Sequence, residues 1–161
     1  MREIVLDTET TGLEPQDGHR IIEIGCIELM NHVPTGRVFH HYVNPGRAID
    51  AGAQAVSGIT DEMLQDKAPF SAIAEEFLAF IDDAPIVIHN AAFDLAFLNI
   101  EMRHAGLPPL FSERAIDTLA IARRKFPGAP ASKPARPSSG NRPARANTAL
   151  KWSRRLAAVQ T

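Results

Sequence analysis

Two carboxylates stand one residue apart directly after a short apolar run. Asp7 and Glu9 follow residues 4–6, which predict a buried strand. Alternate residues of a strand point to the same face, so both carboxylates can converge on one cation. A cation would offset the cost of burying acid there, and hard oxygen ligands favour Mg²⁺ or Mn²⁺. A solvated strand end followed by a polar turn would show the same pattern.

A third acid follows a second apolar run. Asp94 comes after the expected strand 85–88 and lies in the first turn of an expected helix. An acid in that position could simply interact with the helix dipole. Alternatively, Asp94 faces Asp7 and Glu9 across the sheet. Three carboxylates from two strand ends could hold two cations about 3.5–4 Å apart, the arrangement that hydrolyses phosphodiesters.

The elements that must position these acids follow from periodicity and turn composition. Residues 11–18 predict a turn, and three strands in succession predict an antiparallel meander. Helices then alternate with strands, with Thr60 as the expected N-cap of a short helix and Gly106 ending the helix that carries Asp94. This order predicts an α/β fold with a mixed sheet and helices on its faces. The expected strands cover 4–6, 21–29, 37–43, 85–88 and 115–117, and the main helices 69–82, 91–104 and 118–125.

Composition separates the chain into two unlike parts. Its 161 residues are enough for one domain with a core. Residues 1–117 contain all 19 Asp and Glu, whereas residues 118–161 contain 10 Lys and Arg and no acid. After Ser132 the chain becomes rich in Pro, Ala and Arg and has no apolar stripe, so we expect disorder over residues 133–149. We therefore expect an incomplete domain over 1–132 and a basic tail over 133–161, either a frameshift product or a genuine linker.

Other features exclude several protein classes. The single cysteine, Cys26, rules out an internal disulfide framework and lies in an apolar run, which predicts a buried thiol. No apolar run approaches the length of a membrane span, and the N-terminus does not have the pattern of a signal peptide. These observations predict a cytoplasmic location and no membrane partner.

Two short motifs resemble those of a known enzyme family. Residues 7–12, Asp-Thr-Glu-Thr-Thr-Gly, and residues 89–94, His-Asn-Ala-Ala-Phe-Asp, resemble the first two motifs of the DEDD superfamily of 3′–5′ exonucleases. The similarity is closest to the epsilon (proofreading) subunit of bacterial DNA polymerase III and covers about residues 2–132. It implies a ribonuclease-H-like fold, two Mg²⁺ or Mn²⁺ ions, and release of nucleoside 5′-monophosphates from a single-stranded DNA 3′ end. It also implies association with the polymerase catalytic subunit, through a segment that would lie beyond residue 161.

The resemblance also implies roles for individual residues. Asp7, Glu9 and Asp94 would be the catalytic metal ligands. The remaining matched positions would bind substrate, although His89 could equally make a hydrogen bond at the strand end. The expected substrate-binding residues are Thr8, Thr10, Thr11, Gly12, Leu13, His89 and Asn90.

The chain departs from the family pattern at its third motif. That motif is a histidine, the general base, followed five residues later by a fourth carboxylate. No acid follows Asp117 and no histidine follows His104, so we identify no general base. We interpret Asp117 as structural. Gly52 and Ser57 stand where the family often has an acid and a histidine, in a segment over 50–60 that we expect to be a loop.

Three functions remain open from the sequence. The chain could be an impaired proofreading exonuclease, a non-catalytic module that binds nucleic acid or polymerase, or an RNA-directed exonuclease of the same superfamily. The histidines do not favour a separate metal site, because His40 and His41 are neighbours on a strand and should point to opposite faces.

Overall fold

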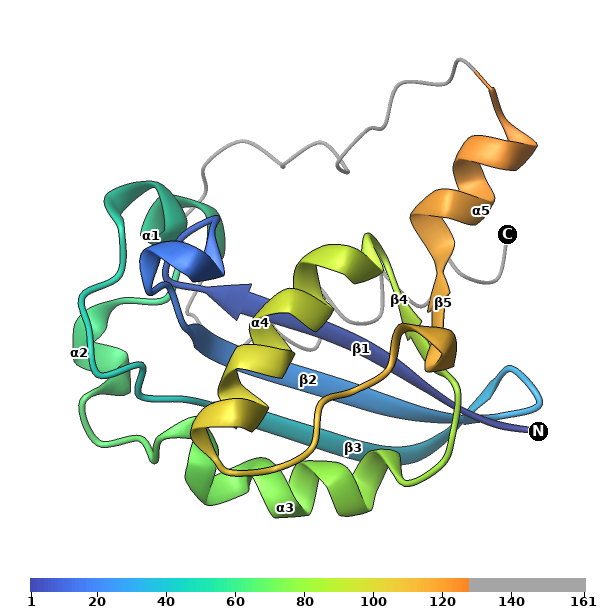
Figure 1. Cartoon of the computed structure of the whole chain (residues 1–161), viewed down its shortest axis with the longest axis horizontal. Coiled ribbons are helices and arrows are strands. Elements are labelled where there is room, and N and C mark those ends of the chain that lie inside the picture. Colours follow the sequence, from blue (N-terminus) through green and yellow to red (C-terminus); the bar gives the residue numbers. More distant parts are fainter. Residues whose placement is uncertain (128–161) are drawn as a thin grey trace.

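A five-stranded sheet in the order β3-β2-β1-β4-β5 forms the centre of the molecule (Figure 1). The computed structural model describes residues 1–127, so our expectations for the tail lie outside the described residues. The strands are β1 (Arg2–Thr10), β2 (Ile21–Met30), β3 (Val33–Tyr42), β4 (Ile86–Ile88) and β5 (Ala115–Asp117). The helices are α1 (Ala51–Ser57), α2 (Asp61–Leu64), α3 (Phe70–Ile81), α4 (Ala91–His104) and α5 (Thr118–Lys125), with short 3-10 turns η1 (Pro15–Asp17) and η2 (Ser112–Arg114).

The sheet is mixed, as the sequence predicts. Strands β1, β2 and β3 form an antiparallel meander, whereas β4 and β5 run parallel to β1. The parallel pairing brings the end of β4, and the start of α4 after it, next to β1. The α/β fold class is therefore confirmed, and β1 lies at the centre of the sheet.

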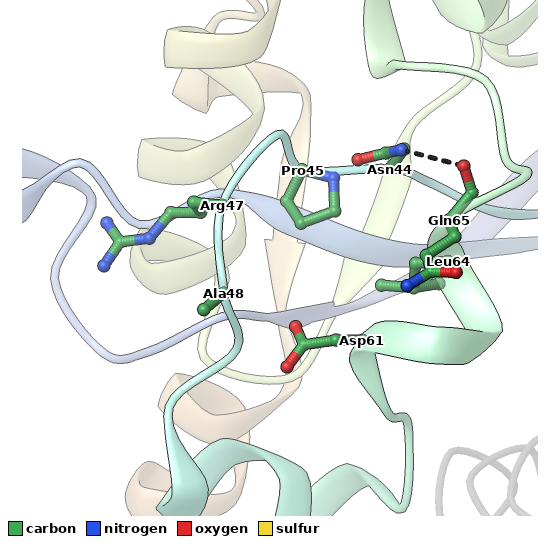
Figure 2. Close-up of a pocket in the computed structure, with 7 residues that line it drawn as sticks. All are labelled: Asn44, Pro45, Arg47, Ala48, Asp61, Leu64 and Gln65. Atoms are coloured by element: carbon green, nitrogen blue, oxygen red, sulfur yellow. Dashed lines mark hydrogen bonds between the residues drawn. The ribbon is translucent and has the colours of Figure 1, made fainter.

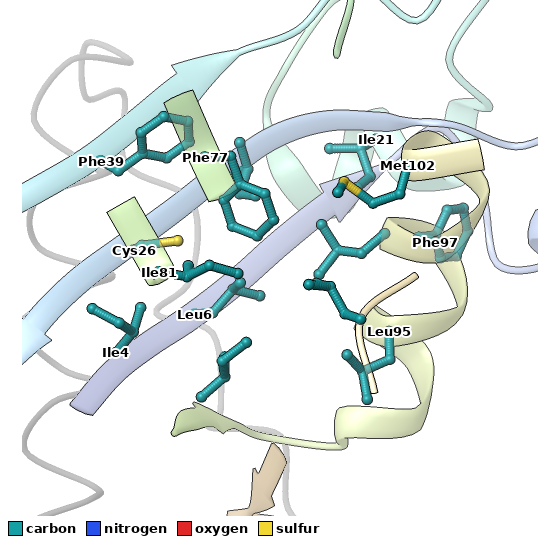
Figure 3. Close-up of a cluster of buried hydrophobic side chains, with 14 of the residues drawn as sticks. Ile4, Leu6, Ile21, Cys26, Phe39, Phe77, Ile81, Leu95, Phe97 and Met102 are labelled. Carbon is teal, nitrogen blue, oxygen red and sulfur yellow. The ribbon is translucent and has the colours of Figure 1, made fainter. Parts of the chain in front are cut away.

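The first face of the sheet, defined as the side toward which Ile4 and Leu6 point, carries the main hydrophobic core. Helices α3 and α4 pack there and bury apolar side chains against the strands (Figure 3). Phe77 and Leu98 are fully buried, as the helical spacing predicts. Cys26 is also buried in this core, where desolvation raises the pKa of its thiol.

The second face, defined as the side of Val5 and Val87, carries a smaller apolar cluster. Val5, Ile27, Leu29 and Val87 form this cluster, and Ile116 packs against it. All of these residues belong to strands. Because side chains alternate along a strand, Asp7 and Glu9 share this face with Val5.

Several predictions of local structure succeeded. The bounds of α4, β5 and α5 are as predicted. Strand β3 begins four residues earlier than expected and includes Pro34, which is tolerated because β3 is an edge strand. No helix among residues 1–127 is long and apolar enough to cross a membrane.

Three further expectations were wrong. The strand expected over 4–6 extends over Arg2–Thr10 as β1, so Asp7 and Glu9 lie within this strand rather than after it. The segment over 50–60 was expected to be a loop, but it contains α1, a helix that buries none of its residues. An apolar stripe therefore gives no sign of it. Thr60 does occupy the position before α2, but its side chain makes no capping hydrogen bond.

Candidate active site

The expected catalytic residues lie around the C-terminal end of β1. Asp7 pairs with Gly25 and Glu9 pairs with Glu23 across the antiparallel ladder, and a register shift follows directly after Glu9. Both acids are half-buried. The last four residues of β1 thus contain two carboxylates that project toward the second face, with Thr8 between them projecting toward the first.

Asp94 reaches the same strand end from α4. Its Oδ1 accepts hydrogen bonds from the Thr8 amide at 3.0 Å and from the Thr8 hydroxyl at 2.7 Å. The parallel pairing of β4 with β1 makes this possible, because it delivers the first turn of α4 beside Thr8. The structure therefore joins the two motifs through Thr8, the residue that separates Asp7 from Glu9.

Burial changes the acidity of Asp94. Its side chain lies in the protein interior, and desolvation raises its pKa from 3.8 to about 6. The two hydrogen bonds from Thr8 oppose this shift, while the nearby negative charge of Glu9 adds to it. Two carboxylates that repel each other at a buried strand end are an environment that a cation would stabilise.

A second acid faces Glu9 from the neighbouring strand. Glu23 is buried and lies directly opposite Glu9 in the ladder. Its Oε1 lies 2.8 Å from His40 Nε2 on β3, whereas His41 points to the first face, toward Glu76. No role for Glu23 or His40 follows from the sequence, because only the strand register places them on the same face as Glu9.

The turn after β1 is held by its own polar groups. The Thr10 hydroxyl donates to the Gly12 carbonyl at 2.6 Å, and Thr11 is completely buried. Leu13 is 75% exposed, so its side chain is accessible to a ligand. Of the four expected substrate-binding residues in this segment, Thr10, Thr11 and Gly12 thus form a compact turn, and Leu13 projects from it.

His89 and Asn90 lie at the start of α4 and contact the β5–α5 junction. His89 Nδ1 lies 3.1 Å from the Thr118 hydroxyl, which is the strand-end hydrogen bond considered above. The Asn90 amide donates to Asp117 Oδ1 at 3.1 Å. Asp117 also accepts from the amides of Leu119 and Ala120 and so caps α5, which confirms its structural interpretation.

The three expected metal ligands are of the chemical type that binds divalent cations. Asp7, Glu9 and Asp94 offer hard carboxylate oxygens around one strand end. Within residues 1–127, however, no group of three His, Cys, Asp or Glu side chains lies close enough together to hold a metal ion. The assignment of these three acids as joint metal ligands therefore stays a prediction.

A separate pocket lies between the end of β3 and α2 (Figure 2). It has a volume of about 280 Å³ and is lined by Asn44, Pro45, Arg47, Ala48, Asp61, Leu64 and Gln65. None of the expected catalytic or substrate-binding residues lines it. Asp61 is already engaged there, because its Oδ1 accepts from the Ile49 amide at 2.9 Å.

Sequence comparison relates the chain to exonucleases. Residues 4–147 match the family model described as exonuclease (RNase_T). The DNA polymerase III subunit epsilon of Rickettsia felis is 53% identical over 131 residues, which cover 80% of this chain and 57% of that protein. The protein of the same name from Escherichia coli K12 is 46% identical over 134 residues, covering 79% of this chain and 55% of the relative. The chain thus spans a little over half the length of these relatives.

Solved structures show the same architecture. Exonuclease X in complex with 5′ overhanging duplex DNA is 30% identical, with a TM-score of 0.58, and the match covers 78% of this chain and 65% of that chain. The metal-free form of the E. coli ExoI–ssDNA complex has a TM-score of 0.68 and 18% identity, covering 80% of this chain and 31% of the other. The second likeness bears on the fold alone.

Proposed function

The chain belongs to the exonuclease family, and we propose that it is a 3′–5′ exonuclease of the DNA polymerase III epsilon type that hydrolyses the 3′-terminal phosphodiester of single-stranded DNA. The observation that carries the proposal is the pair of Thr8–Asp94 hydrogen bonds, which bring the acid of one motif to the strand end that bears the other two. The relatives are named as a subunit of DNA polymerase III, which supports DNA replication as the setting. Proofreading as the role and the cytoplasm as the location are parts of the proposal.

The residues around the C-terminal end of β1 would have two roles: some would bind cations and others would position the substrate. Asp7, Glu9 and Asp94 would hold two divalent cations, Mg²⁺ or Mn²⁺, which when bound supply hydroxide and stabilise the leaving oxygen. The turn over 10–13 lies directly after these acids and would hold the terminal nucleotide, with Thr8 orienting Asp94. Exposed Leu13 would contact the base.

We further propose that this chain has little exonuclease activity. No acid follows Asp117 and no histidine follows His104, so the family's fourth carboxylate and general base have no counterpart in this sequence. Loss of a general base costs about 10²–10⁴-fold in rate. Both losses would fall on one site, so their effects need not multiply. Sequencing the coding DNA around Ser132 would test whether a frameshift removed them.

The experiment is hydrolysis of a 3′-labelled single-stranded DNA oligonucleotide by the full chain with Mn²⁺. We expect slow release of nucleoside 5′-monophosphate that is abolished in Asp94→Asn. Asp83→Asn is the matched control, because Asp83 is an exposed acid that no part of the proposed site uses. Equal rates for the two variants would contradict the proposed role of Asp94.

A second candidate is a non-catalytic module that binds nucleic acid. The observation in its favour is the ten basic residues and no acid in residues 118–161. If the chain is such a module, it should bind an oligonucleotide without Mn²⁺, and its affinity should fall steeply as the salt concentration rises. Parallel assays with an RNA oligonucleotide test the RNA-directed alternative, and co-purification with a polymerase III catalytic subunit tests the proposed partner.

A further inference from the structure

We propose that His19 is a positioning residue that holds the turn after β1, residues 10–13, in place for the substrate. The role of His19 toward the substrate rests on the function proposed above. Its role in holding the turn rests only on contacts within the chain. His19 lies between η1 and β2 and is buried, with 9% of its surface exposed. It is distant in sequence from Asp94 and belongs to neither family motif.

The imidazole makes a directed hydrogen bond to the turn. His19 Nδ1 lies 2.9 Å from the hydroxyl of Thr11, and the same hydroxyl oxygen accepts from the Arg20 amide at 3.0 Å. Because the hydroxyl oxygen accepts a hydrogen bond from the Arg20 backbone amide, the hydroxyl group can in turn donate a hydrogen bond to Nδ1. The ring proton then lies on Nε2, the nitrogen that faces Asp50 Oδ2 at 3.5 Å.

The ring also fills the space beneath the turn. A Cβ added at Gly12 would lie 2.3 Å from His19 Cε1, which is closer than any side chain could tolerate. The absence of a side chain at Gly12 therefore lets the turn pack directly on the imidazole. The turn and the ring are complementary in shape as well as in hydrogen bonding.

A third contact joins the turn to α1. The Asp50 amide, at the start of α1, donates to the Thr11 carbonyl at 3.0 Å, and the Asp50 carboxylate faces His19. Since α1 buries none of its own residues, such contacts at its ends must contribute to its placement. His19 thus supports two neighbouring segments at once.

The next residue anchors this segment to the helix that carries Asp94. Arg20 forms a bidentate pair with Glu101 of α4, with both N–O distances at 2.6 Å, and Glu101 is buried. The dipeptide His19-Arg20 therefore connects the turn after β1 to α4. This connection places the expected nucleotide-binding turn at a defined distance from Asp94.

Amide exchange on the full chain, measured by NMR, tests the positioning directly. In His19→Ala, exchange of the Thr11 and Asp50 amides should rise roughly tenfold through local opening, with no change in the amides of α4. In His19→Asn, the side-chain oxygen can still accept from Thr11, so protection of the Thr11 amide should be largely retained. A uniform rise across the whole chain would show that His19 serves general stability only and would overturn the proposal.

A double substitution tests the shape complementarity. Gly12→Ala should disorder the turn when the ring is present, and His19→Ala in the same chain should restore part of the lost protection by making room. If Gly12→Ala is tolerated beside His19, or if removing the ring restores nothing, the imidazole does not determine the conformation of the turn.

Binding of thymidine 5′-monophosphate with Mn²⁺ links the turn to function. His19→Ala should weaken binding roughly tenfold without a matching change in melting temperature, and His19→Asn should recover most of the affinity. If the unaltered chain does not bind the nucleotide, the proposed function fails for this chain, and the exchange pattern alone decides whether His19 positions the turn. Unchanged affinity in His19→Ala would overturn its role toward the substrate.

Discussion

The two faces of the sheet differ in what they bury. On the first face, Leu6 and its neighbours pack against helices α3 and α4 in one continuous core. On the second face, the apolar cluster consists of strand residues around Val5 and Leu29. Farther along β1, the second face carries Asp7 and Glu9, with Glu23 opposite Glu9.

This difference separates stability from chemistry within a single strand. Ile4 and Leu6 anchor β1 to the core, while Asp7 and Glu9 on the alternate positions are half-buried. Thr8 lies on the first face and brings Asp94 to the strand end. The packed first face therefore positions the acids, and the second face exposes Asp7 and Glu9 in part.

The largest expected loss of stability comes from truncating a core leucine, and the same truncation should cost less on the second face than on the first. Leu6→Ala should lower the free energy of unfolding by about 4 kcal/mol, because helices packed over it prevent the cavity from collapsing, and Leu29→Ala by about 2 kcal/mol. Urea unfolding of both variants measures the difference. Equal losses would show that the second face is packed as tightly as the first.

Removing Arg20 should be the next most damaging change. Arg20→Ala leaves Glu101, with 2% side-chain exposure, as an unpaired buried charge and should cost about 3 kcal/mol. Arg37→Ala is the control: Arg37 is 62% exposed, and its partner Glu28 keeps Arg2. Thermal unfolding should separate the two variants clearly, and similar melting temperatures would mean that the Arg20 pair does not stabilise the first face.

Replacing Asp94 should stabilise the protein at neutral pH in the absence of divalent cations. Its pKa is raised from 3.8 to about 6 by burial, so between these values the unfolded chain has released its proton while the folded chain retains it. Each rise in pH through this window favours unfolding, and the destabilisation is complete above pH 6. Asp94→Asn should therefore gain about 2 kcal/mol at pH 7 and almost nothing at pH 4.

Unfolding measured from pH 4 to pH 8 for both chains checks this prediction. Adding Mn²⁺ should reduce the advantage of Asp94→Asn, because a bound cation favours the ionised carboxylate. An advantage that is constant with pH would indicate a packing effect rather than the buried charge.

The smallest effect is expected at the edge of the sheet, where β5 leads into α5. Asp117→Ala removes the side-chain acceptor for the amides of Leu119 and Ala120 and should cost about 1 kcal/mol. Faster exchange of these two amides would report it, and Asp117→Asn should retain much of their protection. Full protection in Asp117→Ala would show that the cap contributes nothing.

The regular elements could be predicted because their signals are local. The end of α4 follows from Gly106, which comes two residues after it, and β2 follows from a segment rich in isoleucine and other apolar residues, although Glu23 and Glu28 interrupt it. Helix α1 could not be predicted in this way, since it has no buried side and depends on contacts such as that between Asp50 and Thr11. The earlier start of β3 likewise depends on its pairing with β2.

The sequence by itself determined the central elements, the mixed sheet, and the placement of Asp7, Glu9 and Asp94 at strand and helix ends, because these depend on periodicity and residue type. Only the tertiary structure decided that Asp94 bonds to Thr8, 86 positions away, and that burial raises its pKa. It also decided that His19 fills the space beneath Gly12. Such environments are created by side chains from distant segments, which no local pattern encodes.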